Sequence, residues 1–248
     1  GNDEISELYD YLNKMILDIQ RLLAGIYQEK IHAEQLKTKQ KDAEFMMLTS
    51  QINPHFLYNT LETIRMKARI NKQYEIEELV QMLAKILRRN IQAGEKDVTI
   101  RSEVELVEYY LKIQQYRFGD KIQYQIEVEE EVEDYWILPL ILQPIVENAI
   151  VHGLEKKETA GHIYIEIKKQ KEEVLIIVKD DGTGIEAEKL AEIQRELKNT
   201  RLKGEHIGIC NVQHRIRLKY GTEYGMKIDS TVDEGTEVTV RLPGVIEE

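Results

Sequence analysis

Cysteine is nearly absent from this sequence, and basic residues are outnumbered by acidic ones. The one cysteine, Cys210, excludes an internal disulfide framework and a cysteine-rich metal site, as is typical of a protein from a reducing compartment. Thirty-four lysines and arginines stand against 45 acidic residues, which gives a net charge of −11. This charge argues against a broad nucleic-acid footprint and against docking on anionic lipid.

Long uninterrupted apolar runs are also missing. The longest, WILPLILQPIV, is short and broken by proline, so we do not expect it to cross a bilayer. We likewise expect no signal peptide at the start of the sequence. The chain has 248 residues, 42% of them hydrophobic and 32% charged, which predicts about two ordinary globular domains.

The first forty-odd residues have the pattern of a helix that needs a partner. Apart from Gly1 and Gly25, this stretch contains neither glycine nor proline. Its apolar residues recur at spacings of three and four: Ile5, Leu8, Leu12, Met15, Ile16, Ile19, Leu22 and Leu23. The spacing predicts a coiled-coil seam and therefore a second copy of the chain. A solvated helix packed on its own domain would have a similar pattern.

The stretch LTSQINPHFLYNTLETI places a histidine directly after a proline in a helical pattern. Past Pro54, apolar residues form one stripe: Leu57, Leu61, Ile64 and Ala68. His55 lies two residues before Leu57, so we expect it on the exposed side of the helix. A second stripe over 76–91 completes a helical hairpin whose apolar faces are too wide for one hairpin to cover. Two hairpins would form a four-helix bundle.

The pattern changes in the second half of the chain. The stretch SEVELVEYYLKIQQYRFG predicts a helix opened by a capping box of Ser102 and Glu105. Period-two alternation then predicts strands near 121–129, 162–169, 173–181, 226–232 and 236–243. Helical patterns near 139–152, 186–197 and 208–219 are interleaved with them. The predicted fold class is α+β, with an N-terminal coiled coil and helical hairpin followed by an α/β sandwich.

Two glycine-containing stretches carry residues suited to nucleotide binding. In DDGTG, Asp180 at a strand end could accept the exocyclic amine of adenine, while Gly182 and Gly184 allow close approach of the backbone. Asp-Gly pairs after strands are usually only turns. In KGEHIGICNVQHRI, the amides of Gly208 and Ile209 at a helix N-terminus could hold phosphate oxygens, although a bare glycine cap looks similar.

A third stretch, ENAIVHG, is predicted to lie on a helix. Its residues Glu147, Asn148 and His152 offer oxygen and nitrogen atoms beside a hydrated Mg²⁺. The alternative is a plain polar helix face.

Together and in this order, these stretches resemble a known family. An asparagine box, a D-x-G-x-G box, a glycine-rich segment and EGTEVTV resemble the Bergerat-fold ATP-binding domain, through Asn148, Asp180, Gly182, Gly184, Gly204, Gly208, Gly235 and Thr236. With QINPHFLYNTL, YLKIQQYRFGDK and LQPIVENAIVHGL, residues 45–243 resemble the LytS/YesM-type sensor histidine kinases. DEISELYDYLNKM further resembles the second helix of a HAMP linker, which would connect to a membrane-spanning sensor outside this sequence.

The resemblance implies an organisation in three parts. Residues 1–44 would form a HAMP-derived signalling helix, 45–95 a dimerisation and phosphotransfer hairpin, and 96–248 the Bergerat-fold catalytic domain. The implied cofactors are ATP and Mg²⁺. The implied partners are a second copy of the chain and a response regulator, with no nucleic acid. The chain would be the cytoplasmic portion of a protein of the bacterial inner (cell) membrane.

The resemblance also implies roles for single residues. His55 would accept the γ-phosphoryl group of ATP, and Asn59 would orient a water or phosphate. From its place beside Asn148, Glu147 is a candidate general base, and the alternative is that it binds Mg²⁺ through water or caps a neighbouring loop. Asn148 would hold Mg²⁺. The implied nucleotide-binding residues, under a lid over 198–207, are Asn148, His152, Asp180, Gly182, Gly184, Ile185, Lys203, Gly204, Gly208, Ile209 and Thr236.

Two residues depart from the family's pattern. Phe56 follows His55 where many histidine kinases carry an acidic residue, although the NPHF pattern of the resembled subfamily has phenylalanine there. Val151 stands where members of that subfamily often carry a basic residue. A catalytically degenerate nucleotide-binding dimeric scaffold that regulates a partner is therefore a second hypothesis. A Bergerat ATPase of the chaperone or topoisomerase type is a third, which the NPHFLYN hairpin disfavours.

Overall fold

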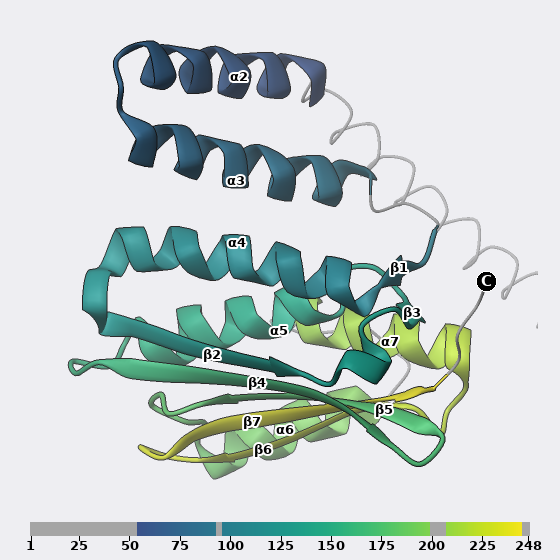
Figure 1. Cartoon of the computed structure of the whole chain (residues 1–248). Helices are drawn as coiled ribbons and strands as arrows, with labels where there is room; N and C mark the ends of the chain where they lie inside the picture. Colours follow the sequence, from purple (N-terminus) through teal and green to yellow (C-terminus); the bar gives the residue numbers. More distant parts are fainter. Residues whose placement is uncertain (1–53, 93–95, 199–206, 245–248) are drawn as a thin grey trace, which may run out of the picture. The chain divides into compact units, whose positions relative to one another are not determined.

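A computed structural model describes residues 54–92, 96–198 and 207–244 (Figure 1). The predicted signalling helix over 1–44 lies outside these residues. The chain divides into two units between Leu57 and Tyr58, and the tertiary contacts described below lie within the second unit, Tyr58–Glu248. None of the described helices is long and apolar enough to cross a membrane.

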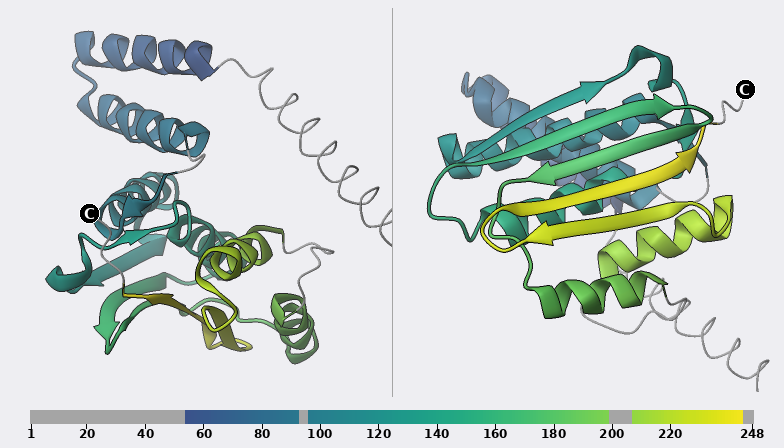
Figure 2. Two further views of the ribbon diagram at one scale, coloured as in Figure 1. Left: turned by 90° about the vertical axis from the view of Figure 1, so that its right-hand side faces the viewer. Right: turned by 90° about the horizontal axis from the view of Figure 1, so that it is seen from below.

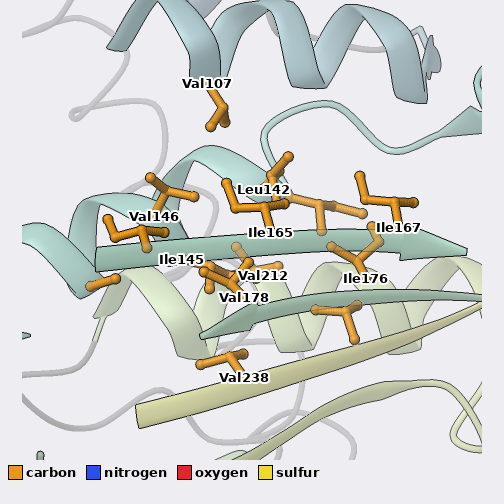
Figure 3. Packing of buried hydrophobic residues seen from close by; sticks show 14 of the residues in the cluster. Val107, Leu142, Ile145, Val146, Ile165, Ile167, Ile176, Val178, Val212 and Val238 are labelled. Atoms are coloured by element: carbon orange, nitrogen blue, oxygen red, sulfur yellow. The ribbon is translucent and has the colours of Figure 1, made fainter. Parts of the chain in front are cut away.

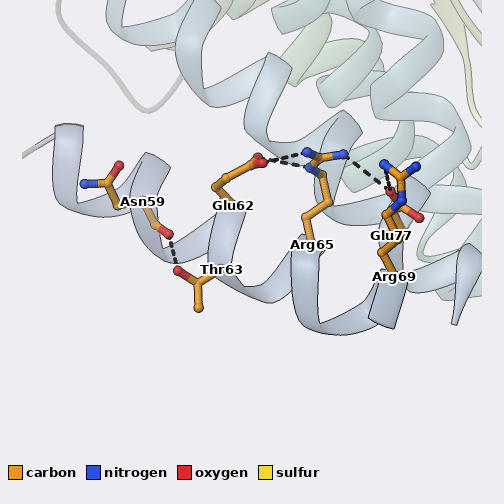
Figure 4. A network of polar contacts seen from close by, with 6 residues as sticks. All are labelled: Asn59, Glu62, Thr63, Arg65, Arg69 and Glu77. Atoms are coloured by element: carbon orange, nitrogen blue, oxygen red, sulfur yellow. Dashed lines mark hydrogen bonds and ion pairs between the residues drawn. The ribbon is translucent and has the colours of Figure 1, made fainter. Parts of the chain in front are cut away.

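Two helices, α2 (Pro54–Ile70) and α3 (Tyr74–Gln92), form the predicted hairpin. The Arg65 guanidinium donates to Glu62 on its own helix and to Glu77 of α3, at 2.5 and 3.4 Å (Figure 4). These contacts are exposed or half-buried, and so each contributes little to stability.

The hairpin leaves much of its apolar surface uncovered within the described residues. Large apolar side chains on α2 and α3 that stay exposed are Phe56, Ile64, Met66, Ile70, Tyr74, Ile76 and Leu83. Ala68, Met82 and Ile86 are buried. The width of the uncovered surface agrees with the expectation that one hairpin cannot cover its own apolar faces.

The rest of the described chain is built on a mixed five-stranded sheet. Its strands are β2 (Ile122–Val128), β4 (Gly161–Gln170), β5 (Glu173–Asp180), β6 (Gly225–Thr231) and β7 (Gly235–Pro243). They lie in the order β2-β4-β5-β7-β6, with β2 parallel to β4 and all other neighbours antiparallel. The five strands predicted from alternation are confirmed. A small second sheet, β1 (Val98–Thr99) with β3 (Trp136–Ile137), was not predicted.

Helices cover one face of this sheet (Figures 1 and 2). They are α4 (Ile100–Phe118), α5 (Leu142–Asn148) and α7 (Ile207–Tyr220). A fourth helix, α6 (Ala187–Lys198), packs beside β6 at the sheet's edge. Helix α5 continues directly into a π-helical turn, η3 (Ala149–Leu154). Two 3₁₀ turns, η1 (Gly119–Lys121) and η2 (Glu130–Val132), flank β2.

Helix α4 begins earlier than the sequence predicted. Its N-cap is Thr99, whose hydroxyl accepts the backbone N–H of Ser102 at 3.3 Å. Glu105 instead bonds to Tyr109. The predicted capping box of Ser102 and Glu105 is therefore wrong. The short strand β1 places Thr99 at the helix start, and the buried side chain of Ile100 draws the first turn into the core.

The core lies between the sheet and its covering helices. Along β4, the side chains of Ile163, Ile165 and Ile167 are buried, while Tyr164 and Glu166 between them are half-buried. Figure 3 shows residues of α4, α5 and α7 packing against β4, β5 and β7: Val107, Leu142, Ile145, Val146 and Val212 with Ile165, Ile167, Ile176, Val178 and Val238. This packing fixes α5 above the end of β5, where Asp180 pairs with Thr236.

Candidate functional site

A cavity of about 400 Å³ opens between the covering helices and one end of the sheet. Apolar side chains form much of its wall: Ile145, Ala149, Val178, Ile185, Ile193, Ile209, Ile228 and Val238. Polar groups also line it, namely Asn148, His152, Lys156, Asp180, Thr183, Glu186, Lys189 and Thr236. A concave apolar pocket with a few polar groups is the usual form of a small-molecule site, and its apolar walls suit a flat heteroaromatic ring.

Asp180 is the buried polar group of this cavity. It ends strand β5, and only 4% of its surface is exposed. Its Oδ1 accepts the backbone N–H of Gly182 at 2.9 Å. Burial raises the pKa of this carboxyl from 3.8 to about 6, although the N–H groups of Gly182 and Thr236 pull it down. At neutral pH the group is therefore mainly an ionised acceptor, suited to an amine donor of a ligand.

Two glycines bring the end of η3 against Asp180. A Cβ atom on Gly153 would lie 2.8 Å from Asp180 Oδ1, and one on Gly182 would lie 2.6 Å from the Gly153 backbone. The π-helical turn delivers Gly153 to this position, since the N–H of Glu155 donates to Ile150 O at 2.8 Å, five residues back. The place of Gly153 was not predicted from the sequence, although its position at the end of ENAIVHG was a usable signal.

The loop after Asp180 is fixed by bonds to η3 and β6. Gly184 has φ of +66°, and a Cβ there would meet Thr231 O at 1.9 Å. The Thr183 hydroxyl donates to His152 O at 3.3 Å, and the Ile185 N–H donates to Ser230 Oγ at 2.9 Å. These bonds hold the predicted residues Gly184 and Ile185 in the cavity wall.

Asn148 reaches the cavity from the end of α5. Its side-chain nitrogen donates to Pro144 O at 2.5 Å, so the amide oxygen is the atom suited to bind a metal ion. Gly208, at the start of α7, lies close by, because a Cβ built there would be 4.0 Å from Asn148 Nδ2. The neighbouring Glu147 does not line the cavity, and its Oε1 accepts from Gln143 Nε2 at 2.6 Å.

The metal chemistry open to this site is limited. Within the described ranges, no three histidine, cysteine, aspartate or glutamate side chains gather as a metal site. The Asn148 amide oxygen is the donor that the sequence singled out, and a ligand's phosphate groups would bring further oxygens. That set suits Mg²⁺, which is commonly bound by few protein groups together with phosphate oxygens and water.

The remaining predicted residues lie elsewhere. His55 and Asn59 are exposed on α2, and Asn59 O accepts the hydroxyl of Thr63 at 2.7 Å (Figure 4). Lys203 and Gly204, together with most of the predicted lid, lie outside the described residues. Sequence analysis missed Lys156 and Lys189, which line the cavity. Neither belongs to a recognisable box, and only the fold brings them to it.

The fold and the cavity together define a helical hairpin followed by an α/β ATPase-type domain. Residues 43–122 match the family described as Histidine kinase. Residues 133–246 match the family described as Histidine kinase-, DNA gyrase B-, and HSP90-like ATPase. The chain belongs to the histidine kinase family, and its second match implies use of ATP. The chaperone- or topoisomerase-type ATPase is set aside by the match over the hairpin.

Curated sensor kinases are similar to this chain over most of its length. Sensor histidine kinase YesM of Bacillus subtilis (strain 168) is 38% identical over 203 residues, 82% of this chain and 34% of that protein. Sensor histidine kinase YpdA of Escherichia coli (strain K12) is 33% identical, covering 95% of this chain and 41% of that protein. Sensor protein kinase HptS of Staphylococcus aureus (strain USA300) is 27% identical, covering 98% and 45%. The chain thus spans less than half the length of these relatives.

Proposed function

We propose that this chain is the kinase portion of a two-component sensor, which transfers the γ-phosphoryl group of ATP to His55 and then to an aspartate of a response regulator. The observation that carries the proposal is Asp180, a buried carboxylate in an apolar cavity of a chain that belongs to the histidine kinases. An exposed imidazole on α2 supplies an acceptor of the right chemistry.

The reaction balances as two phosphoryl transfers. A ring nitrogen of His55 attacks the γ-phosphorus, a P–N bond forms, the bond to the bridging oxygen of ADP breaks, and the imidazole proton passes to a base. A carboxylate oxygen of the regulator then attacks the same phosphorus, the P–N bond breaks, and the released ring nitrogen takes up a proton. In this scheme Asp180 accepts the adenine amine, and the amides of Gly208 and Ile209 face phosphate oxygens at the start of α7.

Cations and a base are needed near the phosphates. Asn148 would hold Mg²⁺, which would neutralise phosphate charge when bound. Lys156 and Lys189 line the cavity and are candidates for the cation that Val151 does not supply, beside Lys203 of the lid. Glu147 remains the proposed base. Its bond to Gln143 orients the carboxylate and leaves a second oxygen to take a proton.

The chain organisation is part of the proposal. We assign 1–44 to a signalling helix, 45–95 to the dimerisation and phosphotransfer hairpin, and 96–248 to the catalytic domain. The exposed apolar side chains of α2 and α3 support a homodimer. By analogy with the sensor kinases it resembles, the chain would form the cytoplasmic portion of a protein of the bacterial inner membrane.

The test is autophosphorylation with γ-labelled ATP. The unaltered chain should acquire a label that is lost in acid and retained in alkali, the behaviour of a P–N bond. His55→Gln should abolish this label and change ATP affinity by less than about twofold, because His55 is not in the cavity wall. His214→Gln, a matched substitution on α7, should keep the label. Persistent acid-labile label in His55→Gln would refute the assignment.

A second candidate function is a nucleotide-binding scaffold without kinase activity. It is favoured by Val151, which is exposed at a position where the resembled subfamily often carries a basic residue. The same experiment separates the two functions. ATP binding with no acid-labile label in the unaltered chain would favour the scaffold.

A further inference from the structure

Outside the cavity, the least accessible ionisable side chain among the described residues is Glu103 of α4, which is 1% exposed. Its two carboxylate oxygens accept three consecutive backbone N–H groups. Oε1 accepts from Leu140 at 2.9 Å, and Oε2 accepts from Ile141 at 3.0 Å and from Leu142 at 3.3 Å. A buried carboxylate is costly unless it is well bonded, so this arrangement calls for an explanation.

The three N–H groups belong to the start of helix α5. The first N–H groups of a helix have no partner within it, and Ile141 at the N-cap provides no side-chain bond. Glu103 therefore caps α5 from another helix. It also holds Leu140 at φ of +57°, a conformation that is unfavourable for a residue with a branched side chain.

Helix α7 is bonded to the same segment as well. Arg215 of α7 donates to Pro139 O at 2.6 Å and to Leu140 O at 3.5 Å, and the Leu138 N–H donates to the Tyr220 hydroxyl at 3.1 Å. The backbone that leads into α5 is thus fixed by polar side chains of α4 and α7. Asn148 lies six residues after Leu142, about 9 Å along a rigid helix. The position of Asn148 therefore depends on the position of the first residues of α5.

A further contact leads from Glu103 to the hairpin. Arg89 of α3 donates to the Ser102 hydroxyl at 2.6 Å, next to Glu103 in the chain. Burial raises the pKa of the Glu103 carboxyl, and the charge of Arg89 is among the influences that lower it. The two side chains are therefore close enough to interact electrostatically. The bond from α3 to Ser102 and the bonds from the start of α5 to Glu103 thus meet at neighbouring residues of α4.

We propose that Glu103 is a positioning residue for the nucleotide cavity, which sets the place of Asn148 through α5, and that Arg89 makes this place depend on helix α3. The inference rests on the proposed role of Asn148 in holding Mg²⁺. It adds a route by which a displacement of the hairpin changes the metal end of the cavity without touching Asp180. A residue that only supports the fold would weaken both ends alike.

The test compares ADP binding with and without Mg²⁺ by calorimetry on the full chain. In Glu103→Gln, one acceptor oxygen becomes an N–H₂ group that faces backbone N–H donors, so the start of α5 must shift. We expect the gain in ADP affinity on adding Mg²⁺ to fall about tenfold, as is usual for residues that orient a metal ligand. Binding in EDTA should change by less than about twofold. Asn148→Ala should show the same pattern.

A control separates positioning from loss of stability. Val174→Ala removes two buried methyl groups at the far end of β5, and it should lower the unfolding midpoint while leaving both ADP affinities within about twofold. If Glu103→Gln does not fold, Arg89→Met carries the test. It lies at the periphery, and it should lower only the Mg²⁺-dependent gain, by about two- to fivefold.

The outcomes are distinct. Equal losses with and without Mg²⁺ in Glu103→Gln, or no loss in either, would overturn the inference, as would an unchanged Mg²⁺ dependence in a folded Arg89→Met. No ADP or ATP binding by the unaltered chain would refute the proposed function and the inference with it. An Asn148→Ala variant that keeps its full Mg²⁺ dependence would refute the assignment of Asn148, and therefore the route proposed from Glu103.

Discussion

A carboxylate buried in an apolar cavity costs folding free energy when it ionises, and Asp180 is such a group. Its pKa of about 6 lies above the ordinary value of 3.8, so the protonated form favours the folded chain. That contribution is complete below about pH 4 and is lost as the pH rises through about 6. Asp180→Asn should therefore be more stable than the unaltered chain at pH 7.5, by at most about 3 kcal/mol in the free energy of unfolding. The variant should unfold at a higher temperature at this pH, and the difference should shrink by pH 4.5.

The same substitution should weaken ATP binding. An amide can present a donor to the adenine amine in place of an acceptor, so ATP affinity should fall at least about tenfold in calorimetry at pH 7.5. Asp229→Asn, which alters an exposed carboxylate on β6, is the matched control and should bind normally. A variant at Asp180 that is stabilised and still binds ATP fully would contradict the adenine role.

Residue type and order in the sequence predicted which side chains lie together, and their roles stay predictions. Asn148, His152, Asp180 and Thr236 all line one cavity, as their boxes suggested. Sequence analysis could not find Glu103. A glutamate in a charged helical stretch looks like a solvated one, and only the fold shows that three backbone N–H groups surround it.

Among elements, α4 offers a test of how its first turn is stabilised. Loss of the Thr99 hydroxyl removes the side-chain acceptor of the Ser102 N–H. Thr99→Ala should thus cost about 1 kcal/mol of stability, measured by denaturant unfolding. Thr222→Ala, in the exposed turn after α7, should cost much less. Equal costs in the two variants would mean that Thr99 does not act as a cap.

The periodicity of the sequence predicted the long helices and strands, but it did not predict the short elements that connect them. Burial alternates most clearly along β4, because helices cover one face of the sheet, whereas Val174, Leu175 and Ile176 of β5 are all buried. The π-helical turn η3 escaped prediction, since one turn of altered winding leaves the apolar period of 139–152 almost unchanged. Strands β1 and β3 have two residues each, too few to show any period. The periodicity of the sequence therefore predicted the sheet and its covering helices. The walls of the cavity, by contrast, are held together by contacts between residues that are distant in sequence.

For the whole molecule, the exposed apolar side chains of α2 and α3 predict a dimer. Light scattering at micromolar concentration should report twice the chain mass. Replacing Ile76 and Leu83 by lysine should give monomers, because each change loses about 1.5–3 kcal/mol of apolar burial in the assembly and adds charge to the interface. Leu218→Lys, an exposed position on α7, should leave the dimer intact. A monomeric unaltered chain would contradict the four-helix bundle.

The lone cysteine gives this chain a practical use in fluorescence work. Cys210 is buried, and burial raises the pKa of its thiol, so maleimide reagents should react with it slowly. Lys171, in the turn that joins β4 to β5, is exposed at the end of the sheet opposite Asp180. Eight residues of strand put it about 25–30 Å from the cavity end of the sheet. A dye on Lys171→Cys would therefore report the binding of a fluorescent nucleotide by energy transfer between the two fluorophores. At this distance the dye should not disturb binding.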